Sequence, residues 1–392
     1  MNASRIFPPL PRISLLLLVA VLFLSACSGG AGDSWAGVSE DPKSDTIYVS
    51  YNQNVTALNS TTGEVIWQYS DPDKDKFYAV PVLDNGTIYV GDYKGKLHAI
   101  NAETGAVRWV YTPTREMLIG PISPTSTDRI IGEVAVDSNK VFFGLGSSNV
   151  VAISRENAEE VWTFKTNHGV WAKPLYVPAN PDDPASRAVV YVVSLDHYLY
   201  ALDAEAGHLI WKKDLGGAAP GDMKYDEQRH LVYVGTFLSE MLAVDLSTHE
   251  IVYRLKTDGW IWGSPALEDD ILYFGDLSGS LYAVRITDSG FEQVWKDSLS
   301  KEAIRATPLL TEDMVIVGSK DKYVYAVNKA DGAQTGSKKT TGEVLSNMVL
   351  VPASGTTPEL VVAGTTQKNH LVVAYKINAI EAWDEIWHYA AK

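Results

Sequence analysis

The sequence predicts an all-β protein, an eight-bladed β-propeller built from four-stranded antiparallel blades. The first reason is a phrase that recurs along most of the chain, of which TIYVGDYKGKLHAINAETGAVRWVY from Thr87 is a clear copy. Copies begin at Thr46, Thr87, Lys140, Val189, Leu231, Ile271, Met314 and Leu360. These starts are 40 to 53 residues apart, the spacing of a four-stranded propeller blade. The second reason is that helical periodicity is weak and apolar stretches alternate or run for a few residues before a Gly, Asp or Pro.

Each copy contains three expected strands. An apolar run of the Ile-Tyr-Val-Gly type comes first, Leu-x-Ala-Leu/Ile-Asp/Asn follows, and Gly-x-Val-x-Trp completes the copy. The Ile-Tyr-Val run is apolar on both faces, which predicts blades that pack face to face with no solvated side.

One more strand is expected ahead of most copies and would be the innermost strand of each blade. It is visible as Val-Pro-Val-Leu-Asp at 80–84, Ser-Pro-Ala-Leu at 264–267 and Thr-Pro-Leu-Leu at 307–310. Proline has no N–H group, so it suits an inner edge strand where that donor would have no ladder partner. This strand brings the total to four in each blade.

The turns and the tryptophans of the repeat have structural explanations. Asx residues are expected to end the third strand at Asn59, Asn101, Asp203, Asp245 and Asn328, and glycines to open the fourth at Gly63, Gly105, Gly207 and Gly332. The fourth-strand Trp recurs as Trp67, Trp109, Trp162, Trp211, Trp295 and Trp387. Tyr253 replaces it in the fifth copy and Gly336 in the seventh. We expect these rings to pack between neighbouring blades.

The N-terminus has the pattern of a secretory signal, here predicted over residues 1–26. Arg5 and Arg12 precede a short apolar run, and Leu-Ser-Ala-Cys at 24–27 resembles the bacterial lipobox. In that motif the cysteine becomes the lipidated first residue of the mature protein, so Cys27 is the predicted lipidation site. Residues 27–34 then form a Gly- and Ser-containing tether, and residues 35–392 form the propeller.

Charge and residue counts exclude several classes of function. The formal net charge is −15 over 392 residues, which disfavours binding to nucleic acid. Cys27 is the single cysteine, so the mature chain has no internal disulfide. No pair among the eight histidines has the spacing of metal ligands, so each is expected at a surface or in a turn, and no metal site is predicted.

The recurring Trp, the Gly ahead of it and the Tyr-Val-Gly strand together resemble the PQQ-type propeller repeat, over about Trp35 to Lys392. The resemblance implies one of two branches. Quinoprotein dehydrogenases hold pyrroloquinoline quinone (PQQ) and calcium, whereas BamB-like lipoproteins are non-catalytic scaffolds of outer-membrane β-barrel assembly. The chain has no adjacent-cysteine pair and no Cys-x-x-Cys-His motif, which favours the second branch, without PQQ, calcium or catalytic residues.

Candidate binding residues emerge when the innermost strands are aligned on their prolines. The position three residues earlier holds Tyr78, Trp171, Trp262 and Arg305, and Trp35 falls there if Val38 takes the place of the proline. Equivalent positions on inner strands converge around the central channel. The residues could therefore plug and pack that channel, or they could form a mouth that stacks a planar ligand or grips a peptide.

The resulting expectation is a non-catalytic envelope lipoprotein that binds a protein partner, such as a β-barrel assembly component, as a monomeric subunit of a complex. It would be extracytoplasmic and held to the membrane by its lipid, facing the periplasm in a bacterium with two membranes. The alternatives are a PQQ-dependent dehydrogenase, a propeller that binds a small ligand, and a surface lipoprotein of a single-membrane bacterium that binds glycan or peptidoglycan. Insertions at Met117–Asp137 and Ala179–Arg187 are equally compatible with binding loops and with simple loop drift.

Overall fold

A computed structural model describes residues 35–113, 128–183, 185–353, 358–377 and 383–391. The predicted signal sequence, Cys27 and the tether lie outside the described residues, as do most of the first insertion and residue 184 of the second. Trp35 and the residues after it belong to one compact unit.

The first four blades follow one another along the chain. Blade 1 contains β1 (Gly37–Asp41), β2 (Thr46–Tyr51), β3 (Asn54–Asn59) and β4 (Val65–Ser70). Blade 2 contains β5 (Val82–Asp84), β6 (Thr87–Gly91), β7 (Leu97–Asn101) and β8 (Val107–Tyr111). Blade 3 contains β9 (Ala135–Val136), β10 (Lys140–Leu145), β11 (Asn149–Ser154) and β12 (Glu160–Lys165). Blade 4 contains β13 (Leu175–Val177), β14 (Val189–Val193), β15 (Tyr198–Asp203) and β16 (Leu209–Asp214).

The last four blades repeat this arrangement. Blade 5 contains β17 (Lys224–Asp226), β18 (Leu231–Thr236), β19 (Glu240–Asp245) and β20 (Glu250–Lys256). Blade 6 contains β21 (Ala266–Glu268), β22 (Ile271–Gly275), β23 (Ser280–Thr287) and β24 (Gly290–Ser298). Blade 7 contains β25 (Leu309–Leu310), β26 (Met314–Gly318), β27 (Tyr323–Asn328) and β28 (Gln334–Lys339). Blade 8 contains β29 (Val349–Val351), β30 (Leu360–Gly364), β31 (Val372–Ile377) and β32 (Trp383–Tyr389).

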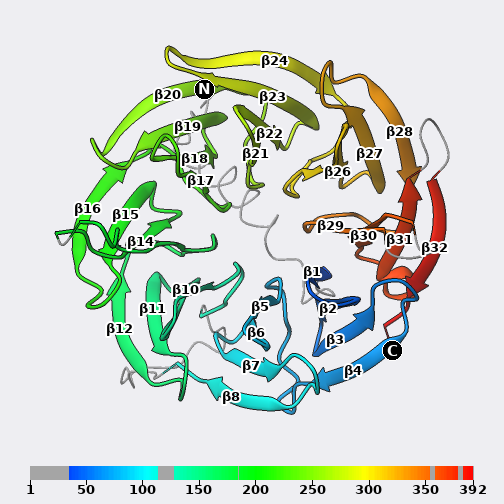
Figure 1. Ribbon diagram of the computed structural model, residues 1–392, viewed down its shortest axis with the longest axis horizontal. Coiled ribbons are helices and arrows are strands. Elements are labelled where there is room, and N and C mark those ends of the chain that lie inside the picture. The colour runs from blue at the N-terminus through cyan, green and yellow to red at the C-terminus, as the bar shows by residue number, and fades with distance from the viewer. Residues whose placement is uncertain (1–34, 114–127, 184, 354–357, 378–382, 392) are drawn as a thin grey trace, which may run out of the picture. The chain divides into compact units, whose positions relative to one another are not determined.

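The eight sheets stand around a common axis, which confirms the predicted eight-bladed propeller (Figure 1). Within each sheet the four strands pair antiparallel in chain order, from the innermost strand outward. The connection from an outer strand to the next inner strand therefore lies at the same end of the blade as the hairpin between the second and third strands. We call this end the hairpin face.

One short 3₁₀ helix, η2 (Lys368–His370), joins β30 to β31. Among the described residues, no helix has the length and apolar character needed to cross a lipid bilayer.

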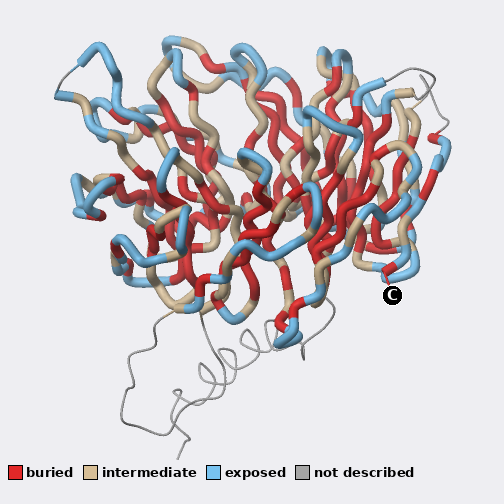
Figure 2. The backbone as a smooth tube through the Cα atoms, turned by 60° about the horizontal axis from the view of Figure 1, so that its bottom comes forward, coloured by how far each residue is buried: buried red, intermediate tan, exposed pale blue. Residues whose placement is uncertain are grey.

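The hydrophobic core lies between the blades. The buried residues of the described chain form eight clusters, and each cluster joins two neighbouring blades. In blade 2, for example, Ile88 and Val90 face blade 1, whereas Tyr89 faces blade 3. Both faces of the second strand are therefore buried, as its uninterrupted apolar run predicts, while exposed residues lie in the turns and along the outermost strands (Figure 2).

The ring closes through side chains and not through a shared strand. Blade 1 and blade 8 each take all four of their strands from one continuous stretch of chain. The cluster between them contains Ile47 and Val49 from blade 1 and Leu360 and Trp387 from blade 8. Closure therefore depends on the same packing that joins any other pair of blades.

The fourth-strand tryptophans dock onto the following blade, as predicted. The indole Nε1 of Trp162 donates a hydrogen bond to the carbonyl oxygen of Ala204 at 3.1 Å, just after the Asx residue of the next blade. Equivalent bonds are made by Trp67, Trp109, Trp295 and Trp387. Each ring covers a turn residue with positive φ. The ring of Trp162 covers Gly207. The ring of Trp211 covers His249, whose imidazole stacks on the indole with ring centroids 4.5 Å apart.

This docking predicts that Gly207→Ala destabilises the protein more than Gly86→Ala does. Both glycines have φ near +70°, but a Cβ at residue 207 would lie 2.5 Å from the Trp162 ring, whereas at residue 86 it would meet nothing within 4 Å. We expect a loss in unfolding free energy of about 1 kcal/mol for Gly86→Ala from the left-handed backbone. For Gly207→Ala, overpacking raises the expected loss to about 2–3 kcal/mol, measured by urea denaturation. Equal losses for the two variants would contradict the docking.

One expectation about the strands needs correction. Pro81, Pro174, Pro265 and Pro308 stand immediately before the innermost strands and not inside them. These strands pair along one edge over two to five residues, and proline, which cannot donate to a ladder, marks their entry.

Blade 7 departs from the docking rule because Gly336 stands where the Trp is expected. Trp383 of blade 8 takes up the space instead, and its Nε1 would lie 2.9 Å from a Cβ at residue 336.

Candidate functional site

The five predicted candidate residues line one central cavity. They are Trp35, Tyr78, Trp171, Trp262 and Arg305, and all five side chains are partly buried. In the strand pairing they occupy equivalent positions, each followed by the innermost strand of its blade. The remaining blades contribute Ile131, Pro220 and Leu345 at the same position. Each blade thus supplies one residue, which places the cavity on the axis of the ring.

Small residues let the inner segments approach closely enough to form this ring. A Cβ at Gly221 would lie 2.0 Å from the carbonyl oxygen of Trp262, and one at Gly132 would lie 2.4 Å from that of Trp171. A Cβ at Gly263 would similarly lie 2.7 Å from the carbonyl oxygen of Arg305. Each glycine directly follows a ring position, so the backbone contact between neighbouring blades holds the ring side chains in place.

The aromatic residues do not point separately into the cavity but touch one another in sequence around its mouth. The ring centroids of Tyr93 and Tyr78 are 4.7 Å apart, and those of Tyr78 and Trp35 are 4.9 Å apart in an edge-to-face contact. The Arg305 guanidinium then lies 5.9 Å from the centre of the Trp35 ring. This part of the line joins blade 1, blade 2 and blade 7.

The line continues from Arg305 toward the outside of the hairpin face. The guanidinium lies 3.9 Å from the centre of Trp262, which is 5.7 Å from Trp171 and 5.6 Å from Phe237 between ring centroids. Phe237 in turn stacks on Trp260 at 5.0 Å. We call this set the aromatic track: Tyr93, Tyr78, Trp35, Arg305, Trp262, Trp171, Phe237 and Trp260.

The outer end of the aromatic track reaches the surface. The Trp260 side chain is 53% exposed, and Leu238, which follows Phe237 in the same hairpin, is 53% exposed as well. Both residues lie on the hairpin face, and large apolar side chains exposed on one face are typical of interaction surfaces. The track therefore leads from the exposed Trp260 ring to the axis of the propeller.

Arg305 is the charged member of the track and has little electrostatic support. Its Nε is buried and has no hydrogen-bond partner among the described residues. Burial lowers the pKa of the guanidinium, and the nearby Glu343 carboxylate offsets only part of that effect. A buried guanidinium N–H without an acceptor is costly, so an acceptor supplied by a bound partner would be favoured.

A polar belt lies two residues beyond the ring positions and links neighbouring blades. The Lys173 ammonium donates to Glu133 at 2.7 Å, and the Lys173 backbone N–H donates to the Asp222 carboxylate at 2.6 Å. The Asp222 backbone N–H donates to Ser264 Oγ at 3.1 Å, and between blades 7 and 8 the Thr307 N–H donates to the Asn347 side chain at 2.9 Å. The inner wall is therefore held by hydrogen bonds as well as by packing.

Two members of this belt have shifted pKa values. Burial, together with the neighbouring Glu133 carboxylate, raises the pKa of Asp222 to about 6 even though the Lys173 and Ser264 groups favour its charged form. Burial opposes the charged form of Lys173 too, but the charge and hydrogen bond of Glu133, with help from Asp222, outweigh it and raise that pKa.

The shift at Asp222 predicts that the contribution of this residue to stability falls as pH rises from about 4 to about 7. The folded-state pKa of about 6 lies above the usual 3.8, so the folded protein favours the protonated acid. This contribution is complete below the unfolded pKa and is lost as pH passes through the folded pKa, at most about 3 kcal/mol. Asparagine at position 222 does not ionise, so Asp222→Asn does not lose stability by this route as pH rises. Urea denaturation at each pH should therefore show the variant gaining stability relative to wild type over that range. A difference between the two proteins that is independent of pH would contradict the shift; exposed Asp182→Asn is the matched control.

A Tyr–His–Asp group at the contact between blades 1 and 2 has a structural explanation. His98 Nε2 lies 3.1 Å from the Asp92 carboxylate and its Nδ1 lies 3.2 Å from the Tyr69 hydroxyl. Other blades place a tyrosine where blade 2 has His98 and bond it to an aspartate of the same hairpin. Asp276, which bonds Tyr282, is at the position of Asp92, whereas the aspartates of Asp196–Tyr200 and Asp321–Tyr325 lie two positions later. The group is thus the blade 2 form of a repeated packing device.

Several residues of this region were missed from the sequence. The segments after Ile131, Pro220 and Leu345 lack the proline on which most of the other ring positions were aligned. These three residues could have been found only by counting back a constant distance from the second strand of each blade. Tyr93, Phe237 and Trp260 lie in turns outside the repeated strands, where no periodic signal exists. The expectation that every histidine lies at a surface or in a turn is wrong for His98, which is fully buried because it replaces a core tyrosine.

Comparison with known proteins agrees with this architecture. The family profile described as "Outer membrane protein assembly factor BamB" matches residues 38–177, 147–291 and 239–385. The BamB of Escherichia coli K12 is 23% identical over 371 residues, covering 82% of this chain and 92% of its own.

Two further similarities place the chain within the wider set of propellers. The crystal structure of BamB from Moraxella catarrhalis superposes with a TM-score of 0.64 at 19% identity, covering 86% of this chain and 92% of that one, which shows a common fold. A quinohemoprotein alcohol dehydrogenase of Pseudomonas putida is 26% identical, over 56% of this chain but 32% of its own. Because the profile matches extend over most of the propeller, the chain belongs to the family of the outer membrane protein assembly factor BamB.

Proposed function

We propose that this protein is a non-catalytic scaffold of the bacterial envelope that binds a protein partner through its hairpin face. The observation that carries the proposal is the aromatic track, which joins exposed Trp260 to Arg305 at the axis. Rigid aromatic rings bury large area at little entropic cost, and Trp, Tyr and Arg dominate binding energy in protein interfaces.

The proposed partner is a component of outer-membrane β-barrel assembly, on the strength of the name that the relatives bear. The chemistry of the track fits a loop or extended segment that supplies an apolar side chain to the exposed Trp260 ring. A carboxylate or carbonyl oxygen of the same segment would accept from Arg305, whose Nε lacks an acceptor among the described residues.

The proposed location is extracytoplasmic, with the propeller held to the membrane by a lipid on Cys27. In a bacterium with two membranes the protein would face the periplasm from the outer membrane. Support comes from the basic start, apolar run and lipobox-like Leu-Ser-Ala-Cys of residues 24–27. The proposal requires that Cys27→Ser abolishes incorporation of labelled palmitate and releases the protein from the membrane fraction.

We also propose that the protein works without PQQ and calcium, because the residues around the cavity do not fit that pair. Trp262 is already in contact with Trp171, Phe237 and Arg305, so a planar quinone could stack on it only by displacing them. Calcium prefers several oxygen ligands. In the described part of the cavity wall the acidic groups are Glu133 and Asp222, which Lys173 already engages.

The test is capture of envelope partners by the full-length lipoprotein after crosslinking in the native host. The Trp171→Ala/Trp262→Ala double variant should lose recovery of its partners by about 30-fold or more, as expected for two central aromatic residues. The matched control is Val65→Ser/Ile66→Ser on β4, which removes exposed apolar area from the outer edge of blade 1. A folded double variant that recovers the same partners at the same level as wild type would rule out the track as the binding site.

A further inference from the structure

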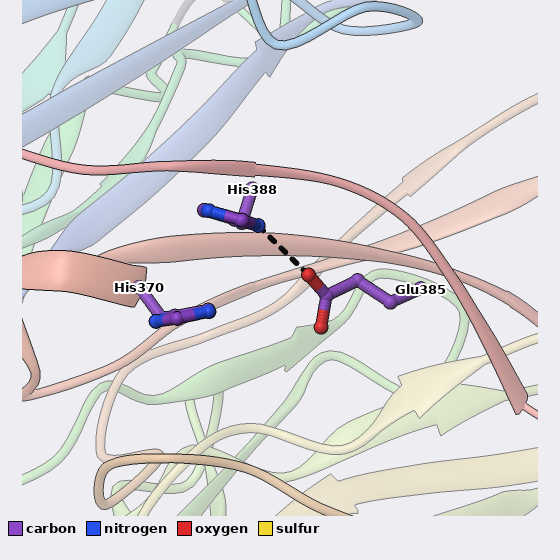
Figure 3. A group of neighbouring side chains, drawn as sticks. All are labelled: His370, Glu385 and His388. Atoms are coloured by element: carbon purple, nitrogen blue, oxygen red, sulfur yellow. Dashed lines mark hydrogen bonds and ion pairs between the residues drawn. The ribbon is translucent and has the colours of Figure 1, made fainter.

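A group of metal-ligating side chains lies on blade 8, far along the chain from the aromatic track. His370 belongs to η2, and Glu385 and His388 belong to β32 (Figure 3). Their ligand atoms all lie within 4.8 Å of one another. The two imidazole rings stack with centroids 4.2 Å apart, and His388 Nδ1 lies 2.8 Å from the Glu385 carboxylate.

The local fold, and not chance contact of flexible side chains, brings these groups together. Glu385 and His388 are three residues apart, which in a regular strand would place them on opposite faces. A β-bulge inserts Ile386 between the pairs Tyr375–Glu385 and Ala374–Trp387, so Glu385 and His388 point to the same face.

Backbone hydrogen bonds fix the third ligand against the same strand. The Leu371 N–H donates to the carbonyl oxygen of Tyr389 at 2.8 Å, and the Ala391 N–H donates to that of Lys368 at 2.9 Å. These two bonds bracket His370 on one segment and lie next to His388 on the other. The main chain therefore sets the separation of the two imidazoles.

We propose that His370, Glu385 and His388 bind a zinc ion. Two imidazoles and one carboxylate form a ligand set that suits zinc, with bonds of about 2.0–2.2 Å, whereas calcium and magnesium prefer oxygen ligands alone. Side-chain rotations that turn the two stacked imidazoles out of their present contact would bring the donors together around one ion. Glu385 and His388 are exposed, so water can complete a tetrahedral shell.

The bound ion would clamp the outermost strand of blade 8 to the connection between its second and third strands. Blade 8 packs against blade 1 to close the ring, so the clamp stabilises the blade on which closure depends. The ion would also stand on the hairpin face, whereas Trp387 docks on the turn between the third and fourth strands of blade 1.

The experiment uses the full-length chain in detergent, purified with an affinity tag that contains no histidine and stripped of metal with EDTA. Isothermal titration calorimetry with zinc chloride should show one saturable site, and excess zinc should raise the Tm by about 2–4 °C. His370→Ala, Glu385→Gln and His388→Ala should each weaken zinc binding by about 10-fold or more and remove the rise in Tm. The control variant is His208→Ala, which removes an exposed histidine from a turn of blade 4 and should bind zinc as wild type does.

Melting each variant in EDTA separates loss of the site from loss of the fold. A variant that matches the metal-free wild type in Tm but fails to bind zinc supports the proposal. Wild type without a saturable zinc site would overturn it, as would full zinc binding by both His370→Ala and His388→Ala. Magnesium and calcium, titrated in the same way, should leave the Tm unchanged, and an equal response to all three ions would also overturn it.

Discussion

Trp387→Ala is expected to lower the free energy of unfolding by about 3–5 kcal/mol, because it removes a buried indole from the contact that closes the ring. The side chain is 8% exposed and packs over Gly63, and its Nε1 donates to the carbonyl oxygen of Ser60 at 3.0 Å. Blades 1 and 8 share no strand, so side-chain packing bears most of this contact.

The matched control for this variant is Trp67→Ala, which deletes the equivalent docking between blades 1 and 2. Those two blades also remain joined by continuous chain, whereas blades 1 and 8 are at opposite ends of it. Hydrogen exchange followed by mass spectrometry should therefore show faster exchange in all strands of blades 1 and 8 for Trp387→Ala, and a smaller, local effect for Trp67→Ala. Indistinguishable exchange in the two variants would show that the ring closes by other means.

Asp276→Ala is expected to cost about 4–5 kcal/mol of unfolding free energy, since it leaves several buried donors without an acceptor. The carboxylate is fully buried and accepts five hydrogen bonds. The donors are the backbone N–H groups of Gly259, Ser278 and Ser280 and the hydroxyls of Ser278 and Tyr282. Together they join the β22–β23 hairpin to the loop that enters blade 6, so we expect the variant to unfold at markedly lower urea.

Asp276→Asn provides the graded control. The amide oxygen can still accept the three bonds made to Oδ1, but the amide nitrogen cannot accept from the Gly259 N–H. We expect about 1–3 kcal/mol for this variant, clearly less than for alanine. If alanine and asparagine cost the same, or alanine costs under about 1 kcal/mol, the hydrogen bonds do not have the role assigned to them.

Most of the fold was predictable because the repeat carries its own structural signals. The double-sided apolar run of residues 87–91 predicts a strand buried on both faces, and Gly105 with Trp109 predicts a tight turn and a docking ring. The entry of the innermost strands was less predictable. Two or three residues after a proline contain too few side chains to mark where pairing begins.

The candidate site was likewise predictable only in part. Trp35, Tyr78, Trp171, Trp262 and Arg305 were found from the sequence because they occupy one repeated position. Their mutual contacts could not be predicted, since the side-chain direction at the axis depends on how closely the inner segments approach at Gly132, Gly221 and Gly263. Whether these residues bind a partner stays a prediction that the Trp171→Ala/Trp262→Ala variant tests.

The sequence by itself determined the blade number, the strand order and the docking positions, because each is a local pattern repeated at a constant spacing. Only the tertiary structure decided which irregular residues meet. Trp260 joins the aromatic track, and His370 meets His388 across a bulge and a 3₁₀ turn. Such contacts depend on loop conformation and on closure of the ring, and neither of these produces a periodic pattern in the sequence. The scaffold is therefore determined by local patterns in the sequence, whereas its candidate sites are determined by tertiary contacts.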